Sequence, residues 1–169
     1  SDVFLMWPDT MDQVKAILDD MRQRAEGYNR KLKFGYRAHV IVRETEAEAR
    51  NAAATLISKL DDGIGNDIRN RSLDSASVGV RRQAEMRDAA NAAGTGDYVE
   101  DNLWTGVGRA RSGCGAAIVG DPDQVLAKLN AYRDLGIEAF ILSGYPHQEE
   151  CDLFGKYVLP KLNHAPLEV

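Results

Sequence analysis

The stretch Lys33–Val42 limits the possible folds more than any other part of the sequence. It is rich in aromatic and β-branched residues and has charged residues at both ends, which is typical of a β-strand. Side chains alternate between the two faces of a strand. One face is therefore apolar and is expected to lie beneath helices, and its residues are Phe34, Tyr36, Ala38, Val40 and Val42.

The opposite face of this strand carries two polar side chains, Arg37 and His39, next to Gly35 and Ile41. Burying a guanidinium group without a partner costs several kcal/mol. Arg37 must therefore pair either with a carboxylate in the core or with an anionic ligand. The strand pattern alone leaves both interpretations open.

The composition indicates one globular domain, because the chain has 169 residues, of which 44% are hydrophobic and 28% charged. No window approaches the roughly eighteen apolar residues of a transmembrane helix and no secretory leader is visible, so a cytoplasmic protein without a membrane partner is expected. The net charge of −5 and the lack of a Lys/Arg cluster argue against nucleic acid as a partner. The two cysteines and three histidines have no metal-ligand spacing, so no metal site is expected.

The rest of the pattern alternates strands with helices. Short apolar runs predict buried strands at Asp2–Trp7 and Ile137–Ser143, and a helix follows each strand. Such alternation indicates a parallel sheet with helices outside it. Helix starts are marked by capping sequences, in which a side chain three residues after the cap reaches back to it. These sequences are Thr10–Gln13, Thr45–Glu48 and Asp121–Gln124.

The segment from about Gly63 to Gly115 breaks this pattern. A helix is predicted at Val80–Ala93, and the stretch Trp104–Gly115 is rich in glycine and contains Arg109 and Arg111. A long irregular segment inside a compact domain is usually functional, often as a lid, and a solvated variable loop is the alternative. Glycine-rich backbone beside arginine suits an oxyanion such as phosphate or sulfonate, but the spacing matches no dinucleotide or P-loop motif.

Three main strands are too few for a closed sheet, because both edges and one apolar face would stay uncovered. The chain is therefore expected to be part of a larger β/α barrel, in which the C-terminal strand ends build the active site. Trp7, Arg37, His39 and Tyr145 all lie on or just after strands. Tyr145 either donates a proton or packs. In the isolated chain, Arg37 and His39 are expected to face water.

Three stretches make the sequence resemble a known family: Phe34–Thr45, Leu103–Gly108, and Ile141–Glu150 with its turn Ser-Gly-Tyr-Pro-His-x-Glu-Glu. They are similar to the two-component, reduced-FMN-dependent alkanesulfonate monooxygenases of the bacterial luciferase-like superfamily. The resemblance implies an α/β fold that comprises the C-terminal three βα units of a (β/α)8 TIM-type barrel. Residues 1–169 would then be an incomplete C-terminal portion of one barrel domain, with a long insertion or lid at about 63–115, before the last strand.

The resemblance also implies roles for individual residues. Trp7, Arg37, Arg111 and Tyr145 match positions that bind substrate or flavin, and Arg37, His39 and Tyr145 match catalytic positions. Arg37 would bind the sulfonate and take part in proton transfer. His39 would act as a base or orient a partner, and Arg111 would close over anionic groups when the lid orders. Tyr145 would hydrogen-bond substrate or flavin.

The implied reaction uses oxygen and reduced FMN, which a separate NAD(P)H-dependent FMN reductase supplies, to convert an alkanesulfonate to an aldehyde and sulfite. The alternatives are a luciferase-like monooxygenase acting on a sulfone or nitrogen compound, and a non-catalytic anion-binding fragment. The chain begins at the family's sixth strand. We therefore expect it to need a complementary N-terminal barrel segment, to be inactive alone, and to form a homo-oligomer when complete.

Overall fold

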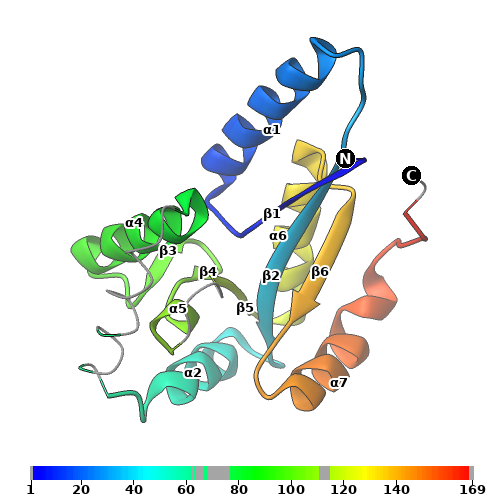
Figure 1. Cartoon of the computed structure of the whole chain (residues 1–169). Helices are drawn as coiled ribbons and strands as arrows, with labels where there is room; N and C mark the ends of the chain where they lie inside the picture. The colour runs from blue at the N-terminus through cyan, green and yellow to red at the C-terminus, as the bar shows by residue number, and fades with distance from the viewer. Residues whose placement is uncertain (1, 62, 64–66, 68–76, 111–114, 168–169) are drawn as a thin grey trace.

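The computed structural model describes residues 2–61, 63, 67, 77–110 and 115–167. These residues form one six-stranded sheet with helices packed against it (Figure 1). Four parallel strands each precede a helix: β1 (Val3–Met6) and α1 (Met11–Glu26), β2 (Lys33–Val42) and α2 (Glu46–Ile57), β5 (Ala117–Gly120) and α6 (Pro122–Leu135), and β6 (Ala139–Ser143) and α7 (His147–Tyr157). The other elements are α4 (Val78–Ala93), β3 (Tyr98–Glu100), β4 (Leu103–Trp104), α5 (Val107–Ala110) and η1 (Leu159–Lys161).

The strand β2 is the centre of the sheet. One of its edges pairs with β6 over Gly35–His39. The other edge pairs first with β1 over Lys33–Tyr36 and then with β5 over His39–Val42. The antiparallel hairpin of β3 and β4 extends the sheet from β5. Within the described part of the chain, β1 and β6 pair only with β2, and β3 pairs only with β4, so each of these strands leaves one edge open.

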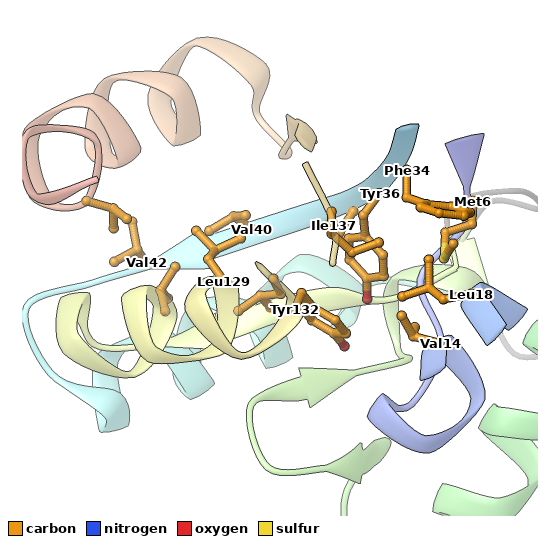
Figure 2. Close-up of a cluster of buried hydrophobic side chains, with 14 residues drawn as sticks. Met6, Val14, Leu18, Phe34, Tyr36, Val40, Val42, Leu129, Tyr132 and Ile137 are labelled. Carbon is orange, nitrogen blue, oxygen red and sulfur yellow. The ribbon is translucent and has the colours of Figure 1, made fainter. Parts of the chain in front are cut away.

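The main core covers the predicted apolar face of β2. All five residues of that face are buried, and α1, α6 and the end of α7 pack on them (Figure 2). The Tyr36 and Tyr132 rings stack with their centroids 4.3 Å apart, and both residues are fully buried. An aromatic pair of this kind contributes about 1 kcal/mol beyond the burial of its surface. The core therefore fixes β2 against the helix α6.

A second cluster covers only the C-terminal end of the opposite face. Ile41 packs there with apolar residues of α2, β4, α5 and β5. Nearer the start of β2 this face stays open, since Leu5 is 48% exposed and Ile141 is 50% exposed. Each lies beside a residue of β2 in the strand register, Leu5 beside Gly35 and Ile141 beside Arg37. The polar face of β2 therefore has an apolar border on both sides.

Two sequence predictions about local structure need correction. The first concerns the helix α1, where the Thr10 side chain makes no capping hydrogen bond. Instead Asp9 accepts the Thr10 N–H at 2.8 Å and Glu100 accepts the Met11 N–H at 3.2 Å, so two carboxylates satisfy these donors. The capping boxes at Thr45 and Asp121 are confirmed.

The second correction concerns the predicted irregular insertion. Its described part contains α4, which confirms the predicted helix with an earlier start, and the hairpin of β3 and β4, which the sequence did not predict. Much of the remaining insertion lies outside the described residues. Among the helices that the structure describes, none is long and apolar enough to cross a bilayer.

Candidate active site

The candidate site lies on the open face of β2, opposite the helices of the main core. Arg37 and His39 project from this face, and the register with β6 pairs their Cα atoms with those of Ile141 and Ser143. Side chains of residues paired in this way point to the same side of a sheet. Arg37 and His39 thus lie in the middle of β2 beside β6, and Tyr145 follows the end of β6 just after Ser143.

His39 is held between β6 and β5. It is only 4% exposed, because Ser143 of β6 and Ala117 of β5 flank it and the Tyr145 ring lies over it. The Ser143 Oγ lies 2.9 Å from His39 Nδ1, which fixes the plane of the imidazole in either tautomer. The expectation that His39 faces water in this chain is therefore wrong.

Tyr145 lies in the turn between β6 and α7, where the Tyr145–Pro146 peptide bond is cis. Its ring is edge-on to that of His39, with centroids 5.1 Å apart and an interplanar angle of 79°. On the other side the exposed His147 ring lies 4.7 Å from Tyr145, also edge-on. Tyr145 also packs against the second apolar cluster. The three rings therefore run from the buried His39 to the surface.

Arg37 is exposed on the open face. No carboxylate of the described residues forms an ion pair or a hydrogen bond with its guanidinium group, so the core-ion-pair interpretation finds no partner there. Ile141, which lies beside Arg37, and Leu5, which lies beside Gly35, are both apolar. A positive charge within an apolar border is suited to an anion that carries a hydrocarbon group.

Trp7 follows β1, whose last residue Met6 pairs with Tyr36, the residue before Arg37. The indole ring packs on the helix α4 at Gly79, where an added methyl group would come within 2.9 Å of Trp7 Cε3. A cavity of about 300 Å³ lies beside this contact, between β1 and α4. Arg111, the remaining predicted site residue, lies outside the described residues.

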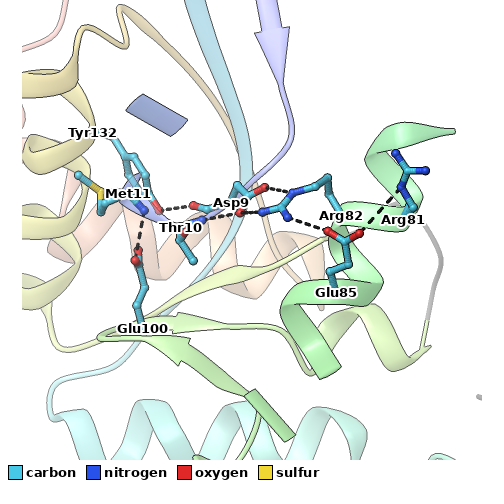
Figure 3. A network of polar contacts seen from close by, with 8 residues as sticks. All are labelled: Asp9, Thr10, Met11, Arg81, Arg82, Glu85, Glu100 and Tyr132. Carbon is cyan, nitrogen blue, oxygen red and sulfur yellow. Dashed lines mark hydrogen bonds and ion pairs between the residues drawn. The ribbon is translucent and has the colours of Figure 1, made fainter. Parts of the chain in front are cut away.

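The helix α4 is fixed to the end of β1 by a polar network (Figure 3). The Asp9 carboxylate is buried and accepts hydrogen bonds from Arg82 Nε and Nη2, both at 3.2 Å. Burial is the largest single influence on the pKa of Arg82 and lowers it, but the hydrogen bonds and negative charges of Asp9 and Glu85 together outweigh burial, and the pKa is raised. Tyr132 donates to the carbonyl oxygen of Asp9, which joins α6 to the same point. The network therefore holds the wall of the site beside Trp7.

Sequence reasoning missed the residues that support the site. Ser143, Arg43 and Glu150 were not predicted to have any role, although Ser143 and Glu150 belong to the distinctive turn sequence. A signal for Ser143 existed in the alternation of β6, because Ile141 and Ser143 must share one face. The pairing of Ser143 with His39 depends on strand register, which the sequence pattern does not specify.

Residues 1–139 match the family model described as luciferase-like monooxygenase (Bac_luciferase). A protein of Novosphingobium aromaticivorans named sulfoquinovose monooxygenase is 64% identical over 169 residues, which cover 100% of this chain and 46% of that protein. A protein of Agrobacterium fabrum with the same name is 54% identical over 166 residues, which cover 98% of this chain and 42% of that protein. The chain thus spans less than half the length of these curated relatives.

Solved structures confirm the expected fold. The crystal structure of riboflavin lyase (RcaE) with modified FMN and riboflavin superimposes with a TM-score of 0.66 at 17% sequence identity. The match covers 96% of this chain and 38% of that chain. The curled sheet therefore corresponds to part of a β/α barrel, as the sequence predicted.

Proposed function

Because the chain belongs to the luciferase-like monooxygenase family, we propose that it is the C-terminal part of a flavin-dependent monooxygenase that cleaves a carbon–sulfur bond. The whole enzyme would convert an organosulfonate to an aldehyde and sulfite. The first candidate substrate is sulfoquinovose, since two relatives more than 50% identical to the chain carry that substrate in their names. Sulfoquinovose is a hexose with a sulfonate on its terminal carbon.

A linear alkanesulfonate is the second candidate. The exposed Ile141 beside Arg37 and the exposed Leu5 beside Gly35 favour it, because they offer apolar contact to an alkyl chain. A sugar gains less from such apolar contacts, so apolar packing at Leu5 and Ile141 would distinguish the two substrates.

The single observation that carries the proposal is the exposed guanidinium group of Arg37. Its guanidinium group lies on the open face with no carboxylate partner among the described residues, next to the buried His39. A guanidinium group presents paired N–H donors that match two oxygens of a sulfonate. We assign Arg37 to sulfonate binding and to proton transfer near the reacting atoms.

His39 and Tyr145 would complete the proposed site. His39, oriented by Ser143, would accept or donate a proton as the carbon next to sulfur is oxidised. Tyr145 would hydrogen-bond the substrate or flavin, and Trp7 would form an apolar wall.

The insertion at about 63–115, with Arg111, is proposed to exclude water as a lid. Hydrogen exchange with and without reduced flavin tests that role, and uniform protection of the insertion without ligand would exclude it.

Reduced FMN suits the open face, because the apolar side chains of Leu5 and Ile141 that border this face can contact a flat ring system. Arg37, Arg111, Trp7 and Tyr145 are the residues of this chain proposed to contact it or the substrate. When bound, the reduced flavin supplies the two electrons that activate oxygen. One oxygen atom would end in the aldehyde and the other in water, while the sulfonate leaves as sulfite.

The proposed partners follow from this chemistry. A separate NAD(P)H-dependent reductase would supply reduced FMN, and an N-terminal barrel segment would cover the open edges of β1 and β6. A homo-oligomer of the complete barrel is also proposed. Size-exclusion chromatography with light scattering measures that state, and a complete protein that is only monomeric would contradict it.

The test of the proposed function is sulfite release by the complete polypeptide in which this chain occurs. The assay supplies reduced FMN and oxygen with sulfoquinovose, with octanesulfonate, or with no sulfonate. We expect sulfite with sulfoquinovose at a higher kcat/KM than with octanesulfonate. Sulfite from neither compound, with a folded protein that binds reduced FMN, would contradict the proposal. Binding of a sulfonate without turnover would instead support the anion-binding alternative.

A further inference from the structure

A partly buried ion pair, in which Glu150 is buried, lies beside the candidate site and has no role in the proposed reaction. Glu150, in the first turn of α7, is 4% exposed, and its Oε1 and Oε2 atoms accept hydrogen bonds from Arg43 Nη2 at 2.7 Å and Nη1 at 3.1 Å. Arg43 Nη1 also donates to the carbonyl oxygen of Val42 at 2.8 Å. Two parallel hydrogen bonds fix the orientation of both groups. The pair therefore joins the start of α7 to the end of β2.

The ion pair lies directly against the turn that carries Tyr145. An added methyl group at Gly144 would overlap Cβ of Glu150 and come within 3.0 Å of the Val40 carbonyl oxygen. The glycine thus lets the Glu150 side chain lie on the backbone one residue before Tyr145. Tyr145 in turn contacts the His39 ring. A displacement of Glu150 would therefore shift Tyr145 through the backbone of Gly144.

We infer that Glu150 and Arg43 are positioning residues that set the orientation of Tyr145 relative to His39. The inference rests on the proposed function, because it assigns the turn a role in sulfonate turnover. The Glu150 side chain packs on Gly144, so the ion pair acts on Tyr145 through the backbone of Gly144.

Stability alone explains this pair less well. Removing two charges from water offsets much of their attraction, and an apolar pair of similar size often leaves stability unchanged or raises it. An apolar pair would not fix the relative orientation of the two side chains, because contacts between methyl groups tolerate rotation and sliding. A two-point ion pair at the base of a turn defines where the next side chain points.

The first experiment changes Glu150→Gln in the complete polypeptide, with Glu149→Gln as the matched control on the exposed side of the same helical turn. We expect kcat for a sulfonate to fall about tenfold in E150Q, with KM within about twofold, and E149Q to match the wild type. In a Tyr145→Phe background, adding E150Q should change kcat less than twofold, because residues that act as a unit are not additive. If the effects of E150Q and Tyr145→Phe on kcat were fully additive, the inference would be overturned.

The second experiment separates positioning from folding. The double variant Arg43→Met/Glu150→Leu replaces the pair with apolar groups of similar size. We expect a melting temperature within a few degrees of the wild type and a kcat as low as in E150Q. Wild-type turnover in this folded double variant would overturn the inference. The double variant also keeps the question testable if E150Q does not fold.

A third measurement does not depend on turnover. The Tyr145 ring lies edge-on to the rings of His39 and His147, so its orientation affects the proton resonances of both imidazoles. We expect these NMR shifts to change in E150Q and to stay unchanged in E149Q. Unchanged shifts in E150Q would overturn the inference. Changed shifts in a protein that releases no sulfite from any sulfonate would support the positioning of Tyr145 and contradict the proposed function.

Discussion

Removal of the Asp9 carboxylate should detach the helix α4 from the end of β1. Asp9→Ala deletes three accepted hydrogen bonds, two from Arg82 and one from the Thr10 N–H. The Asp9 side chain is 6% exposed, so the lost groups were shielded from water. Among the contacts that the described residues show, the variant leaves Arg82 its hydrogen bond to Glu85, at 2.7 Å.

The size of the effect depends on how well Arg82 is hydrated in the variant. Breaking a fully buried pair by removing one partner costs about 3–5 kcal/mol. The Arg82 side chain is 33% exposed, so water can replace part of the lost contact. We therefore expect a loss of about 2 kcal/mol in the free energy of unfolding. This value is larger than the cost of an ordinary surface substitution, which is within about 0.5 kcal/mol.

Urea denaturation of the complete polypeptide measures this loss, with Glu85→Ala as the matched control. Glu85 contacts the same guanidinium group, but its side chain is 49% exposed and its pair should contribute less than about 0.5 kcal/mol. Asp9→Ala should therefore lower the free energy of unfolding roughly three times as much as Glu85→Ala, or more. Equal losses for the two variants would refute the view that the buried carboxylate holds α4.

Two further predictions concern stability. Burial raises the pKa of Tyr36 and Tyr132, so the folded protein holds these phenolic protons more tightly than the unfolded chain. Their contribution is complete below the unfolded pKa of about 10 and is lost as pH rises above it, so melting temperatures should fall from about pH 10 upward, and less steeply in Tyr132→Phe. Thr45→Ala should cost about 1 kcal/mol in urea denaturation, because Thr45 caps α2, whereas Thr10→Ala should cost clearly less, because its side chain makes no capping hydrogen bond. A constant melting temperature to pH 11, or equal costs for the two threonines, would contradict these expectations.

The sequence predicted the central strand well, because its pattern contained two independent signals. Lys33–Val42 has charged boundaries and a strict apolar alternation, and the structure assigns the same bounds to β2. The hairpin of β3 and β4 was missed because strands of three and two residues contain no period that a sequence pattern can reveal. The cap of α1 was predicted wrongly because the Thr10 N–H, which the Gln13 side chain would accept in a capping box, donates to the Asp9 carboxylate instead.

The candidate site was predictable only in part. Arg37 and His39 share a face by strand alternation, and Tyr145 follows a strand that the sequence also predicted. The contact of Ser143 with His39, however, spans 104 residues and depends on the register between β2 and β6. The same holds for Arg43 and Glu150, which are 107 residues apart. Such contacts follow from tertiary packing and not from any local pattern.

The central claim is that Arg37 binds the sulfonate group of the substrate. Sulfite release by Arg37→Ala in the complete polypeptide, with reduced FMN, oxygen and sulfoquinovose, tests this claim most directly. Charge-assisted hydrogen bonds contribute about 3 kcal/mol, so kcat/KM should fall roughly 100-fold or more. Circular dichroism and the melting temperature should stay unchanged, because no described carboxylate depends on Arg37. Turnover at the wild-type rate, or a variant that unfolds, would contradict the claim.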